Sequence, residues 1–265
     1  MKKVLILTTL FFITISAAQS DAKAKAIVDK VTSKVGSYND LKKLKNVEYT
    51  YTFRNPNTQK EDVSTERYIF NGQVSWAKYT HHKEYVATTI ESPIIQYYNG
   101  VDKVLVVDGA KNNIDSKEVA KAGFLRKTNF YWFAMMQKLQ DPGLIYTLLP
   151  NRTVNNINYE VVKLGFEKNI GDVQDEYILY VNPKTLLIDQ FIFTVKALKF
   201  KTPMLMKIKY KEIDGVYLMV ERDIYKSDWN GKHGKNIIFE QRMDNISFTK
   251  NFTKETLVTT DLILP

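Results

Sequence analysis

The chain has 265 residues, of which 44% are hydrophobic, 12% aromatic and 25% charged, and it contains no cysteine. This composition excludes a disordered chain and a disulfide-stapled one, so burial and hydrogen bonding must hold the fold together. The formal net charge of +9 either keeps a β-rich exterior soluble or favours an anionic membrane surface; we expect no nucleic-acid partner.

Residues 1–18 have the pattern of an export signal. Lys2 and Lys3 precede an apolar run over 4–15, and small residues at 16–18 suit cleavage after Ala18. The run is too short for a comfortable membrane span. We therefore expect a periplasmic protein, and removal of the two lysines leaves a net charge of +7. With no cysteine to carry a lipid, the mature chain is expected to be unlipidated, soluble and monomeric.

The first half of the mature chain begins with helical spacing and then changes to alternation. A helix is predicted over 21–35, followed by a short one from Ser37 to Leu44 in which Ser37 is the cap. Strands then follow, because apolar and polar residues alternate and turn sequences separate the runs. The predicted strands are 48–53, 66–70, 74–79, 84–90, 94–98 and 103–107.

A central helical region interrupts the strands. Asp115 and Glu118 have capping-box spacing, and helix formers continue to Arg126. Thr128 or Asn129 is predicted to cap a second helix over 130–140, whose apolar circumference requires burial on more than one side. Strands resume afterwards, at 144–149, 159–166, 176–181, 186–195, 204–211, 217–225, 237–244 and 246–248.

No glycine-, serine- or proline-rich linker divides the chain, so residues 19–265 are predicted to form one mainly β (α+β) domain. The segment 175–191 is predicted to form a strand, a turn with Asn182-Pro183-Lys-Thr and a second strand. This segment resembles the corresponding part of the LolA/LolB-like superfamily of periplasmic lipoprotein carriers. The following hairpin at 207–217 and the entry at 41–47 are also similar. The helix before the L-x-D-P-G turn at 139–143 resembles that of uncharacterised exported members.

The resemblance implies a curved antiparallel sheet, a half-barrel of about eleven strands, with the N-terminal and central helices on its concave side. Carriers of this fold hold acyl chains in the half-barrel. The partner implied for this chain is therefore a hydrophobic small molecule or a lipoprotein acyl chain.

Motifs for catalysis are missing from the sequence. It has no G-x-S-x-G elbow and no phosphate-binding glycine loop, and thiol chemistry is excluded. His81 and His82 have poor spacing for zinc and are expected in an exposed loop. We therefore expect no enzyme activity, no catalytic residues, no metal site and no cofactor.

The candidate ligand-binding residues are aromatic or methionine side chains on the central helix and on the first strand: Trp132, Met135, Met136, Tyr51 and Phe53. Such side chains adapt to apolar ligands of varied shape, and they also pack cores. The sequence thus predicts an exported, non-enzymatic protein that holds an apolar ligand in a half-barrel cavity. A cell-envelope hydrolase with paired carboxylates, or a ligand-free scaffold for protein partners, is the alternative.

Overall fold

A computed structural model describes residues 21–109, 115–170, 174–198 and 202–259, so the predicted signal at 1–18 lies outside the described residues. The helices are α1 (Ala22–Val35), α2 (Tyr38–Leu44), α3 (Ser116–Ala134) and α4 (Lys254–Thr259), with a 3-10 turn, η1 (Lys196–Leu198). The first strands are β1 (Asn46–Asn55), β2 (Lys60–Ile69), β3 (Val74–His82), β4 (Ile94–Tyr98), β5 (Lys103–Val107) and β6 (Leu144–Val154). The others are β7 (Ile157–Phe166), β8 (Tyr177–Val181), β9 (Ile188–Phe193), β10 (Met204–Ile213), β11 (Val216–Lys226) and β12 (Phe239–Ser247).

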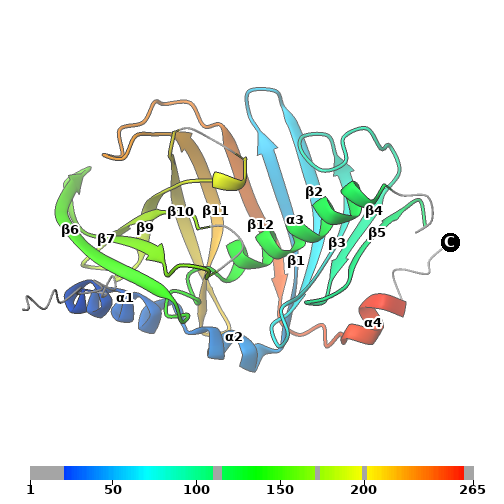
Figure 1. Cartoon of the computed structure of the whole chain (residues 1–265), viewed down its shortest axis with the longest axis horizontal. Coiled ribbons are helices and arrows are strands. Elements are labelled where there is room, and N and C mark those ends of the chain that lie inside the picture. The colour runs from blue at the N-terminus through cyan, green and yellow to red at the C-terminus, as the bar shows by residue number, and fades with distance from the viewer. Residues whose placement is uncertain (1–20, 110–114, 171–173, 199–201, 260–265) are drawn as a thin grey trace, which may run out of the picture.

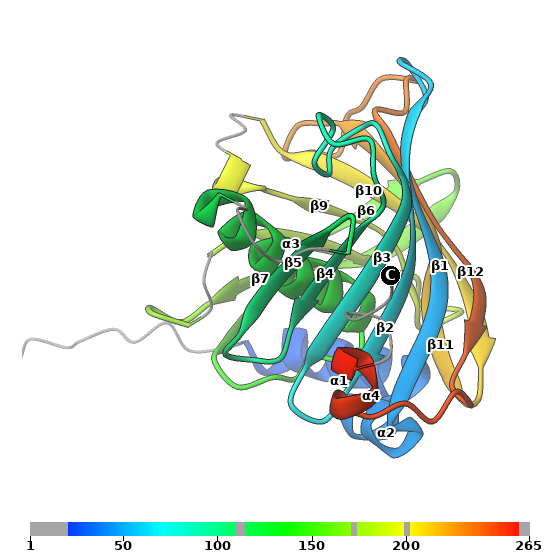
Figure 2. The same cartoon turned by 90° about the vertical axis from the view of Figure 1, so that its right-hand side faces the viewer.

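The described strands form one antiparallel sheet of twelve strands, in the order β5-β4-β3-β2-β1-β12-β11-β10-β9-β8-β7-β6. The chain therefore meanders from β1 to one edge, crosses to the opposite edge through α3, and meanders back until β12 pairs with β1. The sheet is strongly curved, and α3 lies across its concave side (Figures 1 and 2). The predicted half-barrel with helices on the concave side is confirmed.

The sheet must curve for a helix of the length of α3 to cover its concave side. A flat sheet of this size would be roughly 50 Å wide, whereas a helix of the length of α3 spans only about 28 Å. Curling brings the two edges nearer and lets one helix cover the hollow between them. α1 covers the end of the sheet near β6, β7 and β11, while α4 lies against the outer face of β3 and β4 through Leu257.

The N-terminal helices follow the predicted capping chemistry. Asp21 accepts hydrogen bonds from the backbone N–H groups of Lys23 and Ala24, and Ser37 forms a capping box with Asp40. These contacts satisfy backbone donors that have no partner within the helix. α1 buries the apolar face predicted from its spacing, which includes Ile27 and Val31.

The central helix differs from the prediction of two pieces. Thr128 and Asn129 lie inside one helix from Ser116 to Ala134, and turns follow as far as Gln140. The reason is the continuous buried stripe on one face: Ala122, Leu125, Arg126, Phe130 and Phe133. Packing of this stripe outweighs the weak preference of threonine and asparagine for caps.

The predicted strand at 84–90 is also wrong. The backbone N–H groups of Glu84, Tyr85 and Val86 bind the carboxylate of Asp62 at 2.9–3.0 Å, instead of a neighbouring strand. A buried carboxylate thus fixes this segment as a loop. The alternation at 207–211 is confirmed, since Lys209 and Lys211 are exposed on the outer face of β10.

A buried ion pair fastens α3 to the sheet. Arg126 Nη1 lies 2.5 Å from Glu66 Oε2, and both side chains are completely buried. Arg126 also donates to Tyr79 (2.6 Å) and Gln96 (3.1 Å), and Tyr68 donates to Glu66 (2.9 Å). Burial opposes the charge of Arg126, but the Glu66 carboxylate raises the pKa of the guanidinium above its ordinary value. The network therefore holds a charged pair with its hydrogen bonds made.

Removing one partner of this pair should be costly. Glu66→Ala leaves the Arg126 charge buried and uncompensated, so we expect a loss of about 3–5 kcal/mol in the free energy of unfolding, measured by urea denaturation. The control is Glu221→Ala, which breaks the exposed pair with Lys209 (2.7 Å) and should cost about 0–1 kcal/mol. Equal losses for the two variants would contradict a central role for Glu66.

Candidate functional site

The concave side of the sheet carries all five residues predicted from the sequence. Trp132 lies in the last turn of α3, Met135 and Met136 follow it directly, and Tyr51 and Phe53 lie on β1. The structure divides them between two apolar clusters. The first three belong to the cluster over β7–β11, and the other two belong to the cluster over β1, β2 and β12.

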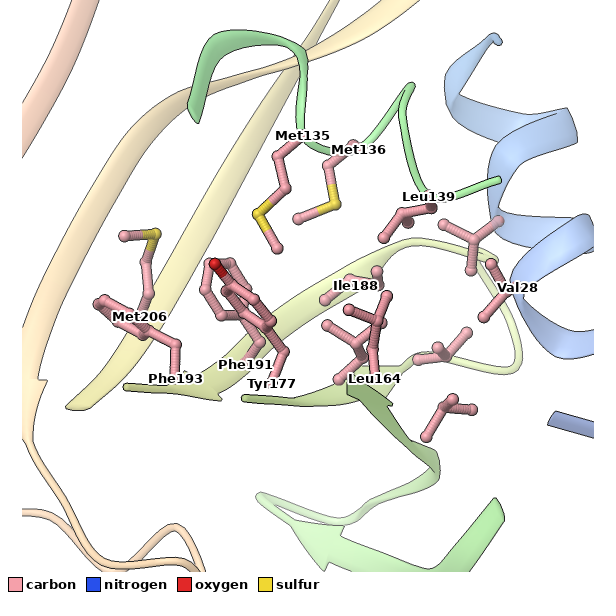
Figure 3. Close-up of a cluster of buried hydrophobic side chains, with 14 of the residues drawn as sticks. Val28, Met135, Met136, Leu139, Leu164, Tyr177, Ile188, Phe191, Phe193 and Met206 are labelled. Atoms are coloured by element: carbon pink, nitrogen blue, oxygen red, sulfur yellow. The ribbon is translucent and has the colours of Figure 1, made fainter. Parts of the chain in front are cut away.

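The first cluster is rich in methionine. Met135 and Met136 are 1% exposed and point from the end of α3 toward Phe191, Phe193 and Tyr177 on the sheet (Figure 3). Five of the seven methionines in the chain lie in this cluster: Met135, Met136, Met204, Met206 and Met219. Methionine side chains are unbranched and flexible, so this part of the core can change shape with little strain.

Trp132 covers one side of the methionine-rich cluster. Its ring stacks on Phe191 with centroids 6.0 Å apart and meets Phe193 edge-on at 5.4 Å. Tyr177 makes a further edge contact at 6.4 Å. Trp132 itself remains half-buried, so an apolar surface of the cluster continues to the outside of the molecule.

Tyr51 and Phe53 point to the same face of β1, as their spacing predicts. Tyr51 is buried, whereas Phe53 is half-buried and stacks on Phe239 with centroids 4.8 Å apart. Phe239 also packs against the methionine-rich cluster. The Phe53–Phe239 stack therefore joins the two clusters across the concave face.

Arg222 lies between the two clusters and was missed by the sequence analysis. Its guanidinium donates to the carbonyl oxygen of Trp132 (3.3 Å) and lies 5.7 Å from the ring centroid of Tyr51. A signal for it existed, since period-two alternation places Arg222 on the same face as Ile224. Its charge argued against burial, yet it is only 2% exposed.

Tyr51 does not neutralise this arginine. Burial raises the pKa of the Tyr51 phenol to about 12, although the Arg222 charge opposes the shift. The phenol therefore stays protonated near neutral pH and offers Arg222 its ring face alone, a cation–π contact.

Two pockets lie elsewhere on the molecule. One, of about 470 Å³, lies between α2, α3 and the hairpin turns near Gly72 and Gly100; the other, of about 430 Å³, lies beside α4. Their linings share Asn71 and include none of the five predicted residues. The predicted ligand-binding role of those five residues stays a prediction.

The buried carboxylates are poorly placed for hydrolysis. Among the described residues these are Asp62 and Glu66, four residues apart on one face of β2, a spacing of about 14 Å along a strand. Glycosidase pairs lie about 5–9.5 Å apart. Both carboxylates are also engaged, Glu66 with Arg126 and Asp62 with the backbone of the following loop.

His81 and His82 were both expected in an exposed loop, and the structure differs from this expectation in part. Both lie in β3; His81 is exposed, but His82 is 4% exposed and its Nε2 is 3.0 Å from the Ser92 carbonyl oxygen. The adjacent loop covers His82 because Asp62 holds that loop against the sheet. In the described ranges, no three His, Asp or Glu side chains gather in a way that could hold a metal ion.

Fold and site together define a mainly antiparallel β protein with an open, curved sheet and an apolar concave face. The chain belongs to DUF6503, a family of unknown function whose sequence profile matches residues 2–230. It matches no curated protein sequence. Within the described residues, no helix is long and apolar enough to cross a membrane.

The chain is similar to two solved structures over most of its length. One is a DUF1329 family protein from Desulfovibrio piger, with 10% identity, a TM-score of 0.49, and coverage of 90% of this chain and 98% of that chain. The other is a putative outer membrane lipoprotein-sorting protein domain from Vibrio parahaemolyticus, with 9% identity, a TM-score of 0.48, and coverage of 91% and 99%.

The packing of the methionine-rich cluster can be tested by one pair of variants. Met136→Ala should lower the free energy of unfolding by about 2–5 kcal/mol because it leaves a cavity in a filled core. Met136→Leu keeps the volume and should cost less than about 1.5 kcal/mol. Guanidinium denaturation measures both, and a negligible cost for Met136→Ala would show that the cluster is loosely filled.

Proposed function

We propose that this chain is an exported, non-enzymatic binding protein that holds an apolar ligand, such as an acyl chain, on the concave side of its half-barrel. The observation that supports this role is the methionine-rich cluster beside α3, with its half-buried aromatic margin at Trp132, Phe53 and Phe239. Flexible methionines and exposed aromatic faces are the side chains that adapt to apolar ligands.

The ligand would enter along this aromatic margin and displace methionine side chains. Met135 and Met136 fill the space between the end of α3 and β9. Rotation of these unbranched side chains opens room without breaking backbone hydrogen bonds. The space would be created by the ligand rather than kept as a permanent cavity.

One observation favours a second candidate, the scaffold for a protein partner. Met135 and Met136 are 1% exposed, which is the burial of an ordinary packed core. In that case Trp132 and Phe53 would be the edges of a core and would have no ligand to contact. Ligand uptake by the purified protein separates the two candidates.

The test uses N-phenyl-1-naphthylamine, an uncharged apolar probe that fluoresces when it leaves water. We expect saturable binding to the purified mature protein, and Trp132→Ala should weaken it about tenfold, because one aromatic wall of the site is lost. The readout is probe fluorescence, and circular dichroism checks that the variant remains folded.

Trp229→Ala is the matched control, since Trp229 is 39% exposed and lies outside both clusters. Its affinity for the probe should equal that of the unmodified protein. Absence of probe binding, together with no lipid extracted from protein purified from the periplasm, would overturn the binding role in favour of the scaffold.

A further inference from the structure

We propose that Arg222 binds the anionic head of the ligand, so that the ligand is an acyl chain ending in an oxyanion, a carboxylate or a phosphate. This inference rests on the proposed binding function and names the class of ligand. The site comprises Arg222 on β11 and Gln241 on β12, between the aromatic side chains of Tyr51, Phe53 and Trp132.

Arg222 is a buried cation that has no counter-ion among the residues the structure describes. It is 2% exposed, and among the described residues it forms no ion pair. Its guanidinium donates one hydrogen bond in that part of the chain, to the Trp132 carbonyl oxygen, and its Nε has no partner. A buried charge is strongly unfavourable unless it is paired, so this guanidinium retains the capacity to pair with an anion.

The other buried arginine on the concave side gives the contrast. Arg126 is completely buried, yet it has Glu66 as counter-ion and Tyr79 and Gln96 as acceptors. The fold thus supplies a full set of partners where an arginine serves only to hold α3. Arg222 has no such set of partners within 21–109, 115–170, 174–198 and 202–259.

The nearby carboxylates already accept hydrogen bonds from other groups. Glu66 accepts hydrogen bonds from Arg126, Ser64 and Tyr68. Asp62 is bound by three backbone N–H groups of the loop after β3. Neither is therefore available to Arg222, and Tyr51 stays uncharged.

Gln241 extends the polar site toward the aromatic margin. It pairs directly with Arg222 across β11 and β12, and with Phe53 across β12 and β1, so the three side chains form one row on the concave face. Gln241 is 8% exposed, and its Oε1 has no hydrogen-bond partner in the described part of the chain. Rotation of its amide presents the NH₂ group, and the row then offers guanidinium and amide donors to an oxyanion.

The apolar part of the ligand would lie on the methionine-rich side of this row. Ile208 on β10 pairs with Arg222, and Met206, two residues earlier on the same face, leads to Phe191. Trp132 covers the same side through its contact with Phe191. The anionic head of an amphiphile would therefore contact Arg222, and its apolar chain would lie along β10 and β9. Each part of the ligand then meets a surface of matching polarity.

The experiment compares palmitate with methyl palmitate, which has the same chain but no charge. Each competes against N-phenyl-1-naphthylamine on the purified mature protein. Palmitate should displace the probe at a concentration about tenfold lower than the ester, because only palmitate pairs with the guanidinium. In Arg222→Met this preference should fall below about twofold while the probe still binds.

Arg242→Met is the matched control. Arg242 lies on the neighbouring strand, is adjacent in sequence to Gln241 and so faces the opposite side, where it pairs with Asp223 (2.6 Å). This variant should keep the full preference for palmitate. Arg222→Met should melt no lower than the unmodified protein in the absence of ligand, since it removes an uncompensated buried charge.

The outcomes separate the two proposals. Probe binding with equal displacement by palmitate and its methyl ester overturns the anionic head and leaves the binding function standing. Failure of the unmodified protein to bind the probe, together with no lipid extracted from protein purified from the periplasm, overturns the binding function itself. Because the comparison of palmitate with its ester uses unmodified protein, it decides even if Arg222→Met fails to fold.

A further arm identifies the source of the oxyanion. Palmitoyl lysophosphatidate carries a phosphate on the same chain length, and palmitoyl lysophosphatidylcholine carries a phosphate neutralised by choline. Stronger displacement by lysophosphatidate than by palmitate indicates a lipid phosphate, and the reverse indicates a free fatty acid. Displacement by the choline lipid as strong as that by both anions contradicts a site selective for net negative charge.

Discussion

The ion pair between Arg126 and Glu66 determines where the central helix lies, and the concave side is organised around that helix. A connection between the two edges of an open sheet must cross one of its faces. The completely buried pair, with its hydrogen bonds to Tyr79 and Gln96, fixes that crossing over β2, β3 and β4. The C-terminal end of α3 then reaches β9–β11, where Trp132 and the methionines meet the sheet.

The contacts between α3 and the sheet differ in kind between the two parts of the concave side. Over β2–β4 the apolar contacts of α3 are joined by a buried ion pair with directional hydrogen bonds, which fixes the position of the helix. Over β9–β11 the contacts are methionine and aromatic surfaces, which tolerate several arrangements. A rigid anchor beside an adaptable cluster is consistent with the proposed binding role, in which the fold stays intact while the cluster rearranges. Arg222 lies at the boundary between these parts, next to Tyr51 and the backbone of Trp132.

The errors in prediction all come from contacts between residues distant in sequence. Local preference placed a helix break at Thr128, but the stripe from Ala122 to Phe133 packs on the sheet as one surface. Alternation placed a strand at 84–90, but the Asp62 carboxylate binds that backbone from another strand. The same loop buries His82, which local sequence placed in an exposed turn. For the helix and the loop, a partner at least twenty residues away changed the outcome, and His82 is covered by the loop that Asp62 holds in place.

The resemblance of the segments at 175–191 and 207–217 to a known superfamily implied the antiparallel half-barrel, and the sequence by itself determined the caps of α1 and α2 and the face to which most strand residues point. The caps and the strand faces depend on periodicity and on contacts within a few residues, which a linear reading contains. It also identified Trp132, Met135, Met136, Tyr51 and Phe53 as residues of the concave side. Only the tertiary structure decided that Arg126 forms an ion pair with Glu66 whereas Arg222 forms none with the residues that the structure describes. That difference depends on which acids from separate strands come within reach, because charge pairing in a folded core is set by distances across the sheet and not by order along the chain.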